Sequence, residues 1–171
     1  IIKVYYRLAG LLLAFMLLVV FNSALYADAV DDGLPVQASE HLRASTRAMI
    51  QAGVDANEAI GMTRTLTQNR FMERNILQAH KTILAACQEN LPAAPLMNKA
   101  YEGMSKQAGE TAILNAMEKT RSRYAHAFAH ARKLSDDESR IETTGHLLAQ
   151  SMAAGLTEED AAAVMNQLQL R

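Results

Sequence analysis

The chain has 171 residues, of which 17 are Lys or Arg and 18 are Asp or Glu, so its net charge at neutral pH is −1. This near balance argues against a dedicated nucleic-acid-binding domain, which carries a large basic excess. Half of the residues are hydrophobic, only 5% are aromatic and none is tryptophan. Such a composition favours closely packed helices over a β-sandwich, whose strands prefer β-branched and aromatic side chains.

The first 29 residues are predicted to be a targeting segment. Lys3 and Arg7 give it a basic start, and an apolar run of 14 residues follows at 8–21. That run is shorter than the roughly 18 residues of a membrane-spanning helix, and Ala27 and Ala29 fit the small-x-small cleavage rule. We therefore expect a signal peptide cleaved after one of these alanines, and a periplasmic or secreted protein. A retained N-terminal anchor is the alternative, and membrane contact is expected only through that uncleaved segment.

A mobile linker at 30–38, where Gly33 and Pro35 lie close together, is expected to lead into a single helical domain at 39–171. Ser and Asp residues placed before apolar periodic stretches predict helix starts, and Gly or Asn residues predict helix ends. The connections are short, which favours antiparallel neighbours. The expected helices lie at about 39–52, 55–66, 70–89, 94–105, 110–133, 135–154 and 158–168.

The longest helix is predicted from apolar residues that recur at steps of three and four, the period of a helix with one buried side. At 1.5 Å per residue the segment 110–133 is about 36 Å long, so shorter helices must pack along it. The predicted fold class is all-α: an antiparallel bundle or a short helix-turn-helix array of about six or seven helices after the signal helix. The expected buried residues of the long helix are Ile113, Met117, Thr120, Tyr124, Ala127, Ala131 and Leu134, with Ala116 and Phe128 widening the same face.

A spaced pattern before this helix and in its first turns is formed by Pro92, Leu96, Lys99, Glu102, Gly103 and Lys106, followed by Ile113 and Ala116. The pattern resembles that of small, exported, uncharacterised helical proteins of Gram-negative bacteria. It covers about 30 residues, and it implies an exported helical protein without implying a mechanism. The chain departs from it at 107–109, where the pattern has Gly-hydrophobic-Pro. Gly103 also carries a helix cost of roughly 1 kcal/mol, which indicates a close approach of another backbone or a local break.

Five cationic side chains follow steps of four, three, four and three along the long helix, and we call them the cationic row: Lys119, Arg123, His126, His130 and Lys133. Because a histidine side chain ordinarily has a pKa near 6.5, such a row gains charge as the pH falls towards 6. It could hold an anionic helix, a lipid headgroup or a polymer. The alternative is that it is simply the solvated side of the helix.

His126 and His130 are also the candidate metal ligands, because histidines four residues apart on a helix can bind one ion. No His-Glu-x-x-His motif is present, and the nearest acidic residues in sequence, Asp136 and Asp137, lie beyond the helix end. Arg123 and Lys133 continue the same face, and their fixed positive charge would oppose a bound cation. We therefore expect no metal site and no cofactor.

The two acidic groups, at 136–138 and 158–160, are interpreted as helix starts, because negative charge is favourable in a first helical turn. Ser135 with Glu138 forms a Ser-x-x-Glu capping box that predicts a helix start at Ser135. Cys87 is the single cysteine and is expected to be a buried structural thiol, with intermolecular pairing as the alternative. No nucleophile motif, phosphate loop or dinucleotide fingerprint is present.

These observations predict an exported cell-envelope domain that acts by protein or surface contacts and is not an enzyme. Its expected partner is an envelope protein or an anionic surface, contacted through the cationic row. The alternative function is a periplasmic helical domain that binds a small molecule or a metal, for which His126 and His130 are the cue.

Overall fold

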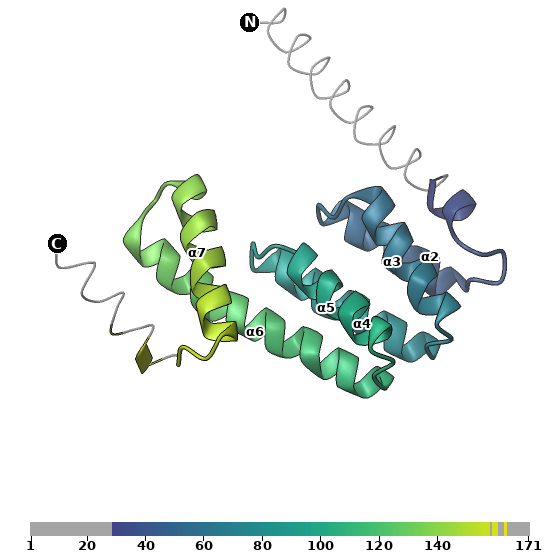
Figure 1. Cartoon of the computed structure of the whole chain (residues 1–171). Helices are drawn as coiled ribbons and strands as arrows, with labels where there is room; N and C mark the ends of the chain where they lie inside the picture. Colours follow the sequence, from purple (N-terminus) through teal and green to yellow (C-terminus); the bar gives the residue numbers. More distant parts are fainter. Residues whose placement is uncertain (1–28, 158, 161–162, 164–171) are drawn as a thin grey trace, which may run out of the picture. The chain divides into compact units, whose positions relative to one another are not determined.

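The computed structural model describes residues 29–157, 159–160 and 163 (Figure 1). Within them all regular secondary structure is helical, which confirms the all-α fold class. The predicted signal peptide lies outside these residues except for Ala29, and so does most of the helix predicted at 158–168. In the described part of the chain, no helix combines the length and the apolar character needed to cross a bilayer. The helices are α2 (Glu40–Gln51), α3 (Ala56–Gln68), α4 (Glu73–Gln88), α5 (Ala94–Ser105), α6 (Glu110–Leu134) and α7 (Glu138–Ala153).

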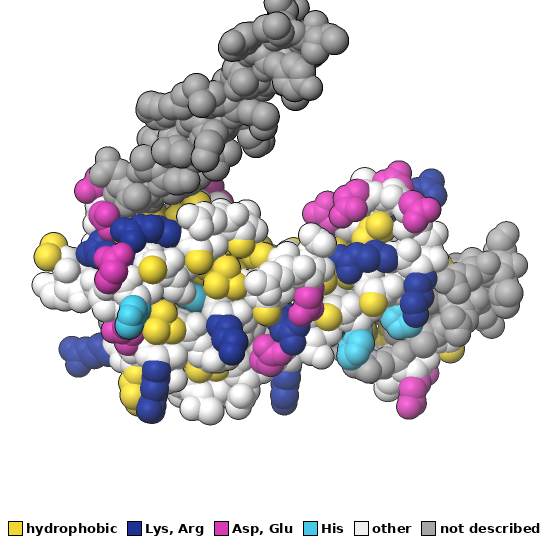
Figure 2. Space-filling view, turned by 180° about the vertical axis from the view of Figure 1, so that it is seen from behind, with side chains coloured by type: hydrophobic (Ala, Val, Ile, Leu, Met, Phe, Trp, Pro, Cys, Tyr) yellow, Lys and Arg dark blue, Asp and Glu magenta, His cyan; other side chains and the backbone are white. Residues whose placement is uncertain are grey.

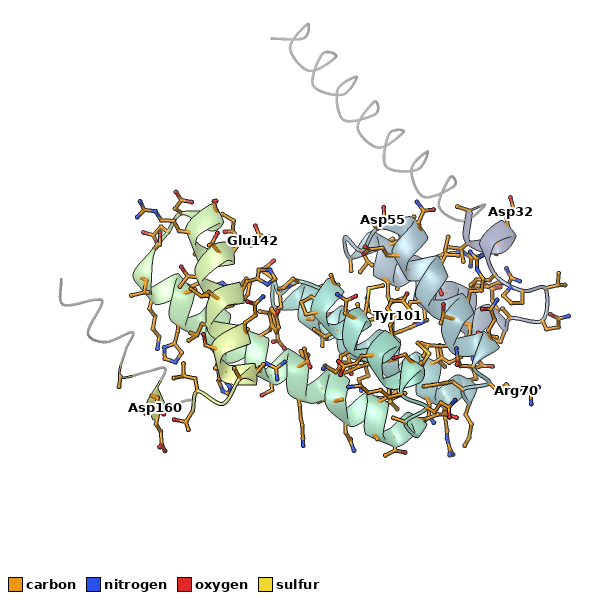
Figure 3. The ribbon with its side chains drawn as sticks, in the orientation of Figure 1. Asp32, Asp55, Arg70, Tyr101, Glu142 and Asp160 are labelled. Atoms are coloured by element: carbon orange, nitrogen blue, oxygen red, sulfur yellow. The ribbon has the colours of Figure 1, made fainter. Side chains whose placement is uncertain are left out.

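The chain divides after Arg70 into two compact units, and each is described by itself. In the first unit α2 and α3 form a helical hairpin. Asp55 begins α3 by accepting hydrogen bonds from two backbone amides of its first turn, and Arg70 follows its far end (Figure 3). Between the helices, the buried hydroxyls of Thr46 and Thr63 lie 3.0 Å apart. Each is also within hydrogen-bond distance of a carbonyl in its own helix, so burial leaves neither hydroxyl unsatisfied.

The segment expected to be a mobile linker is tied to this hairpin by Arg43 of α2. The Arg43 guanidinium donates to the carbonyls of Pro35 at 2.9 Å and Asp31 at 3.2 Å, and to the Asp31 carboxylate at 3.1 Å. Val30 and Leu34 of the same segment are buried. The segment that the sequence predicts to be a mobile linker is therefore attached to the folded unit by an ion pair and by buried apolar side chains.

In the second unit α4, α5 and α7 each pack against α6, with α7 beside its C-terminal half (Figure 1). Six of the seven side chains predicted for the buried face of α6 are buried, and so is Phe128, which was predicted to widen it, while Ala116 and Leu134 are half-buried. The 3.6-residue period therefore identified the packing surface of the central helix, apart from one residue at its side and one at its end.

Two glycines allow the neighbours of α6 to approach closely. A Cβ placed on Gly103 of α5 would lie 2.5 Å from Cγ1 of Ile113, so the close neighbour is a side chain and not the backbone that the sequence indicated. A Cβ on Gly145 of α7 would lie 2.5 Å from Cδ2 of Phe128 and 2.6 Å from Cε2 of the same ring. Both distances are too short for any side chain, so α5 and α7 can pack here only through a bare backbone.

The start of α7 lies at a different residue from the one that the sequence predicts. The predicted start of the last described helix at Ser135 is wrong by two residues, because Asp137 is the N-cap and accepts from the amides of Ser139 and Arg140. Ser135 instead has extended backbone and accepts a hydrogen bond from the Asp137 amide at 3.0 Å. The short acidic side chain two residues later thus displaces the predicted capping box.

The start of α4 has no side-chain cap within its own sequence. Glu110, the first residue of α6, accepts hydrogen bonds from the Met72 amide at 3.0 Å and from Nδ2 of Asn75 at 2.5 Å. A carboxylate at a helix N-terminus satisfies an orphan amide and interacts favourably with the helix dipole. The first helical turn of α4 is therefore stabilised by a residue 35 or more positions away in sequence.

Replacement of Gly145 by Ala tests the contact between α6 and α7. In an unobstructed helix this change stabilises by about 1 kcal/mol, but here the new methyl group meets the rigid Phe128 ring, and overpacking costs about 1–3 kcal/mol. We expect a net loss of stability in denaturant unfolding. Gly61→Ala in α3 is the matched control, because nothing lies within 4 Å of its added Cβ, and it should stabilise the protein. An equal gain from both changes would contradict the close packing.

Candidate functional site

The two flanks of α6 use their basic residues differently. On one flank Arg121 donates to Glu118 through Nε at 3.0 Å and Nη2 at 2.6 Å, and through Nη1 to Glu89, the C-cap of α4. Arg132 donates to the carbonyls of Glu89 at 3.2 Å and Asn90 at 3.0 Å. These carbonyls lie at the C-terminal end of α4, where a cation offsets the helix dipole. The basic residues of this flank therefore join α4 to α6.

The other flank carries the cationic row. Lys119, His126 and Lys133 are exposed, while Arg123 and His130 are half-buried. Within the described part of the chain, no carboxylate lies within ion-pairing distance of Lys119 or Arg123. The helix thus brings the five predicted residues together along one side, and at least two of them keep their charge available to a partner.

Arg123 precedes Tyr124, a member of an aromatic cluster at the interface between α6 and α7. Its Nε is buried and has no hydrogen-bond partner among the described residues. Burial raises the pKa of the adjacent Tyr124, and the charge of Arg123 acts in the opposite direction. The Tyr124 hydroxyl lies 3.4 Å from Nδ1 of His146, whose ring stands edge-on to those of Tyr124 and Phe128.

The histidines of the row lie on successive turns of α6, as a metal-binding pair requires. Among the residues that the structure describes, no three His, Cys, Asp or Glu side chains gather in a way that could hold a metal ion. His126 and His130 can therefore offer two ligands, whereas protein zinc sites use three or four.

The charged residues behind the family resemblance contact one another on α5. Glu102 lies 2.6 Å from Lys106 and also contacts Lys99. The hydrogen bonds from Lys106 and then Lys99 lower the pKa of Glu102 to about 2. With Gly103 packed on Ile113, this pattern is explained by helix pairing and packing, and it adds no chemical group to the site.

A groove between α4 and α6, on the flank away from the row, was not foreseen from the sequence. It has a volume of about 340 Å³ and holds two carboxylates, Glu89 and Glu118, that both contact Arg121. The hydrogen bond from Arg121 lowers the pKa of Glu118 and, reciprocally, Glu118 raises that of Arg121. The two carboxylates of the groove are thus paired with an arginine of the same groove. The lining residues are Gln78, Lys81, Thr82, Ala85, Glu89, Glu118 and Arg121.

The helix-start interpretation of the acidic groups is confirmed where the structure describes them. Asp137 caps α7 directly. Near the second group, the Asp160 amide donates to the Thr157 hydroxyl at 3.1 Å, and that hydroxyl donates back to the Asp160 carboxylate at 2.7 Å. Cys87 is half-buried rather than buried, and burial raises the pKa of its thiol.

Comparison with protein-family models, with curated proteins and with solved structures finds no match to this chain.

His80, in the interior of the second unit, was not singled out by the sequence and makes stability depend on pH. Its side chain on α4 has no exposed surface, and burial lowers its pKa from 6.5 to about 4. The unfolded chain therefore takes up a proton at a higher pH than the folded chain. The contribution of neutral His80 is complete above about pH 6.5 and is lost as the pH falls towards 4.

Between about pH 6.5 and 5, where most carboxylates remain ionised, we expect the free energy of unfolding to fall with a limiting slope of about 1.4 kcal/mol per pH unit from this residue. Urea titrations across this range should show a flatter slope for His80→Leu. His41→Gln, at an exposed histidine of α2, is the control. If His80→Leu left the slope as steep as in the wild type, His80 would not be the titrating group.

Proposed function

We propose that this chain is an exported helical domain of the cell envelope that binds an anionic partner through the cationic row of α6 and does not catalyse a reaction. The observation that carries the proposal is the contrast between the two flanks of one helix. Arg121 is matched by two carboxylates, whereas Lys119 and Arg123 face none in the described chain. The predicted signal peptide supports a location outside the cytoplasm.

The shape of the row favours a macromolecular partner over a small ligand. From Lys119 to Lys133 it extends about 21 Å along the helix axis. The groove between α4 and α6 is lined by no member of the row, and neither is a second one of about 180 Å³ lined by Asn90, Pro92, Phe128, Glu138 and Glu142. Exposed cations on an open surface accelerate encounter with an anionic partner and select its orientation more than they add affinity. Binding should therefore weaken as salt is raised.

Among anionic partners, a protein fits better than a lipid surface. Each Lys or Arg near an anionic membrane contributes about 1 kcal/mol, so the three fixed cations give only about 3 kcal/mol. Stable membrane attachment needs a second signal, such as inserted apolar side chains. In the described chain the exposed large hydrophobic residues are Val36, Met72 and Leu147, and none lies on α6. An acidic surface of an envelope protein can add shape complementarity that a bilayer cannot.

Charge reversal of the row tests this function. The triple change Lys119→Glu, Arg123→Glu and Lys133→Glu should lose a partner that the wild-type chain captures by cross-linking in an envelope fraction. The matched control reverses three exposed basic residues elsewhere, Arg64, Arg70 and Arg74, and should keep the partner. The helical circular dichroism spectrum checks that both variants are folded.

Capture of the same partners by wild type and by the row variant would contradict the proposal and leave the row as a solvated face. Substrate-dependent turnover by the purified protein would contradict its non-catalytic part.

The second candidate function is binding of a small molecule or a metal, and the groove between α4 and α6 is the observation in its favour. Isothermal titration with Zn²⁺ separates the metal form of this candidate from the first. If the row serves a macromolecular partner, we expect no saturable heat, because two imidazoles among fixed cations form an incomplete site. Saturable binding abolished by His126→Ala would favour the second candidate.

A further inference from the structure

The second unit carries an acidic surface that matches the cationic row in both charge and spacing. We call Asp136 and Glu138, on the turn between α6 and α7, the acidic tip. Both are exposed, and within the described residues no basic group lies within ion-pairing distance of either. Acidic side chains gather at this end of the second unit (Figure 2). The chain therefore presents an unmatched anionic group as well as an unmatched cationic one.

The tip and the row match in spacing. Asp136 and Glu138 are two residues apart, so their Cα atoms are separated by at most about 7 Å. Lys119 and Arg123 are four apart on a helix, which places their Cβ atoms about 5–6 Å apart. Two carboxylates can thus meet two cations at once. Asp137, between the tip residues, is occupied as the cap of α7.

The tip cannot reach these cations within one chain. From Arg123 to Leu134, where α6 ends, the helix rises about 16 Å, and Lys119 lies a further turn away. A continuous helix keeps the tip and this end of the row apart. Only the tip of another molecule can therefore pair with Lys119 and Arg123.

We propose that the cationic row binds the acidic tip of a second copy of this chain. The inference rests on the proposed function, because it assigns a partner to the same surface. The contact joins two different surfaces, so it can close reciprocally as a twofold dimer or continue head-to-tail into rings or chains. Since it is built from exposed charges, it should form at low ionic strength and dissociate as salt is added.

The test is sedimentation velocity of the full chain, in a non-ionic detergent that covers the apolar run at 8–21 without adding charge. In about 20 mM salt the mean mass of the wild type should rise with protein concentration, and in about 500 mM salt it should return to that of the monomer. The row variant, Lys119→Glu with Arg123→Glu, and the tip variant, Asp136→Lys with Glu138→Lys, should each bind themselves at least about tenfold more weakly.

A mixture of the row variant and the tip variant distinguishes the proposed contact from other causes of lost association. The row variant keeps the native tip, and the tip variant keeps the native row, so an equimolar mixture should associate although each variant alone does not. Reversal of Arg64 and Arg74, both exposed and outside both surfaces, should leave self-association unchanged. A wild type that stays monomeric at low salt would overturn the proposal, and so would a mixture that does not associate. If the wild type stays monomeric but captures an envelope partner that the row variant loses, the self-contact fails while the proposed function stands.

Discussion

The second unit depends on the buried face of α6, and above all on the two places where a neighbouring backbone lies directly on that face. Gly103 meets Ile113 near the start of the helix, and Gly145 meets Phe128 near its end. At each place the neighbour has no side chain, so the helices approach more closely than side chains would permit. The rest of the α6 surface is free to carry charge because this narrow face already supplies the packing.

The sequence was sufficient for the elements whose cause is local. Apolar periodicity located α6 to within a residue at either end, and Ser39 and Asp55 cap the helices that they were expected to cap. The features it missed are made by residues far apart in the chain. Glu110 caps α4 across 38 positions, and Arg43 contacts three carbonyls of the preceding segment. No spacing rule links such residues, because the fold alone brings them together.

In the candidate site, too, the sequence predicted what depends on local spacing and missed what depends on residues far apart in the chain. Helical spacing correctly placed the five members of the cationic row on one side of α6. It could not show that Arg121 and Arg132, equally basic in sequence, are engaged with α4 while Lys119 and Arg123 face no carboxylate of the described chain. Whether a basic residue joins two helices or faces solvent is decided by its neighbour across the interface. A single sequence does not contain that neighbour's position.

The contacts at the two ends of α4 have a further consequence. Glu110 accepts hydrogen bonds at the first turn of α4, Arg132 donates to the carbonyls of Glu89 and Asn90 just after its last residue, and both belong to α6. The two helices therefore run parallel. Helix termini ordinarily fray, and their amides exchange with solvent long before the domain unfolds. Here fraying at either end of α4 must break a contact with α6. We therefore expect the end turns of α4 to unfold together with α6 rather than separately. If α5, which lies between them in sequence, unfolded locally, α4 and α6 would still be joined at both ends of α4.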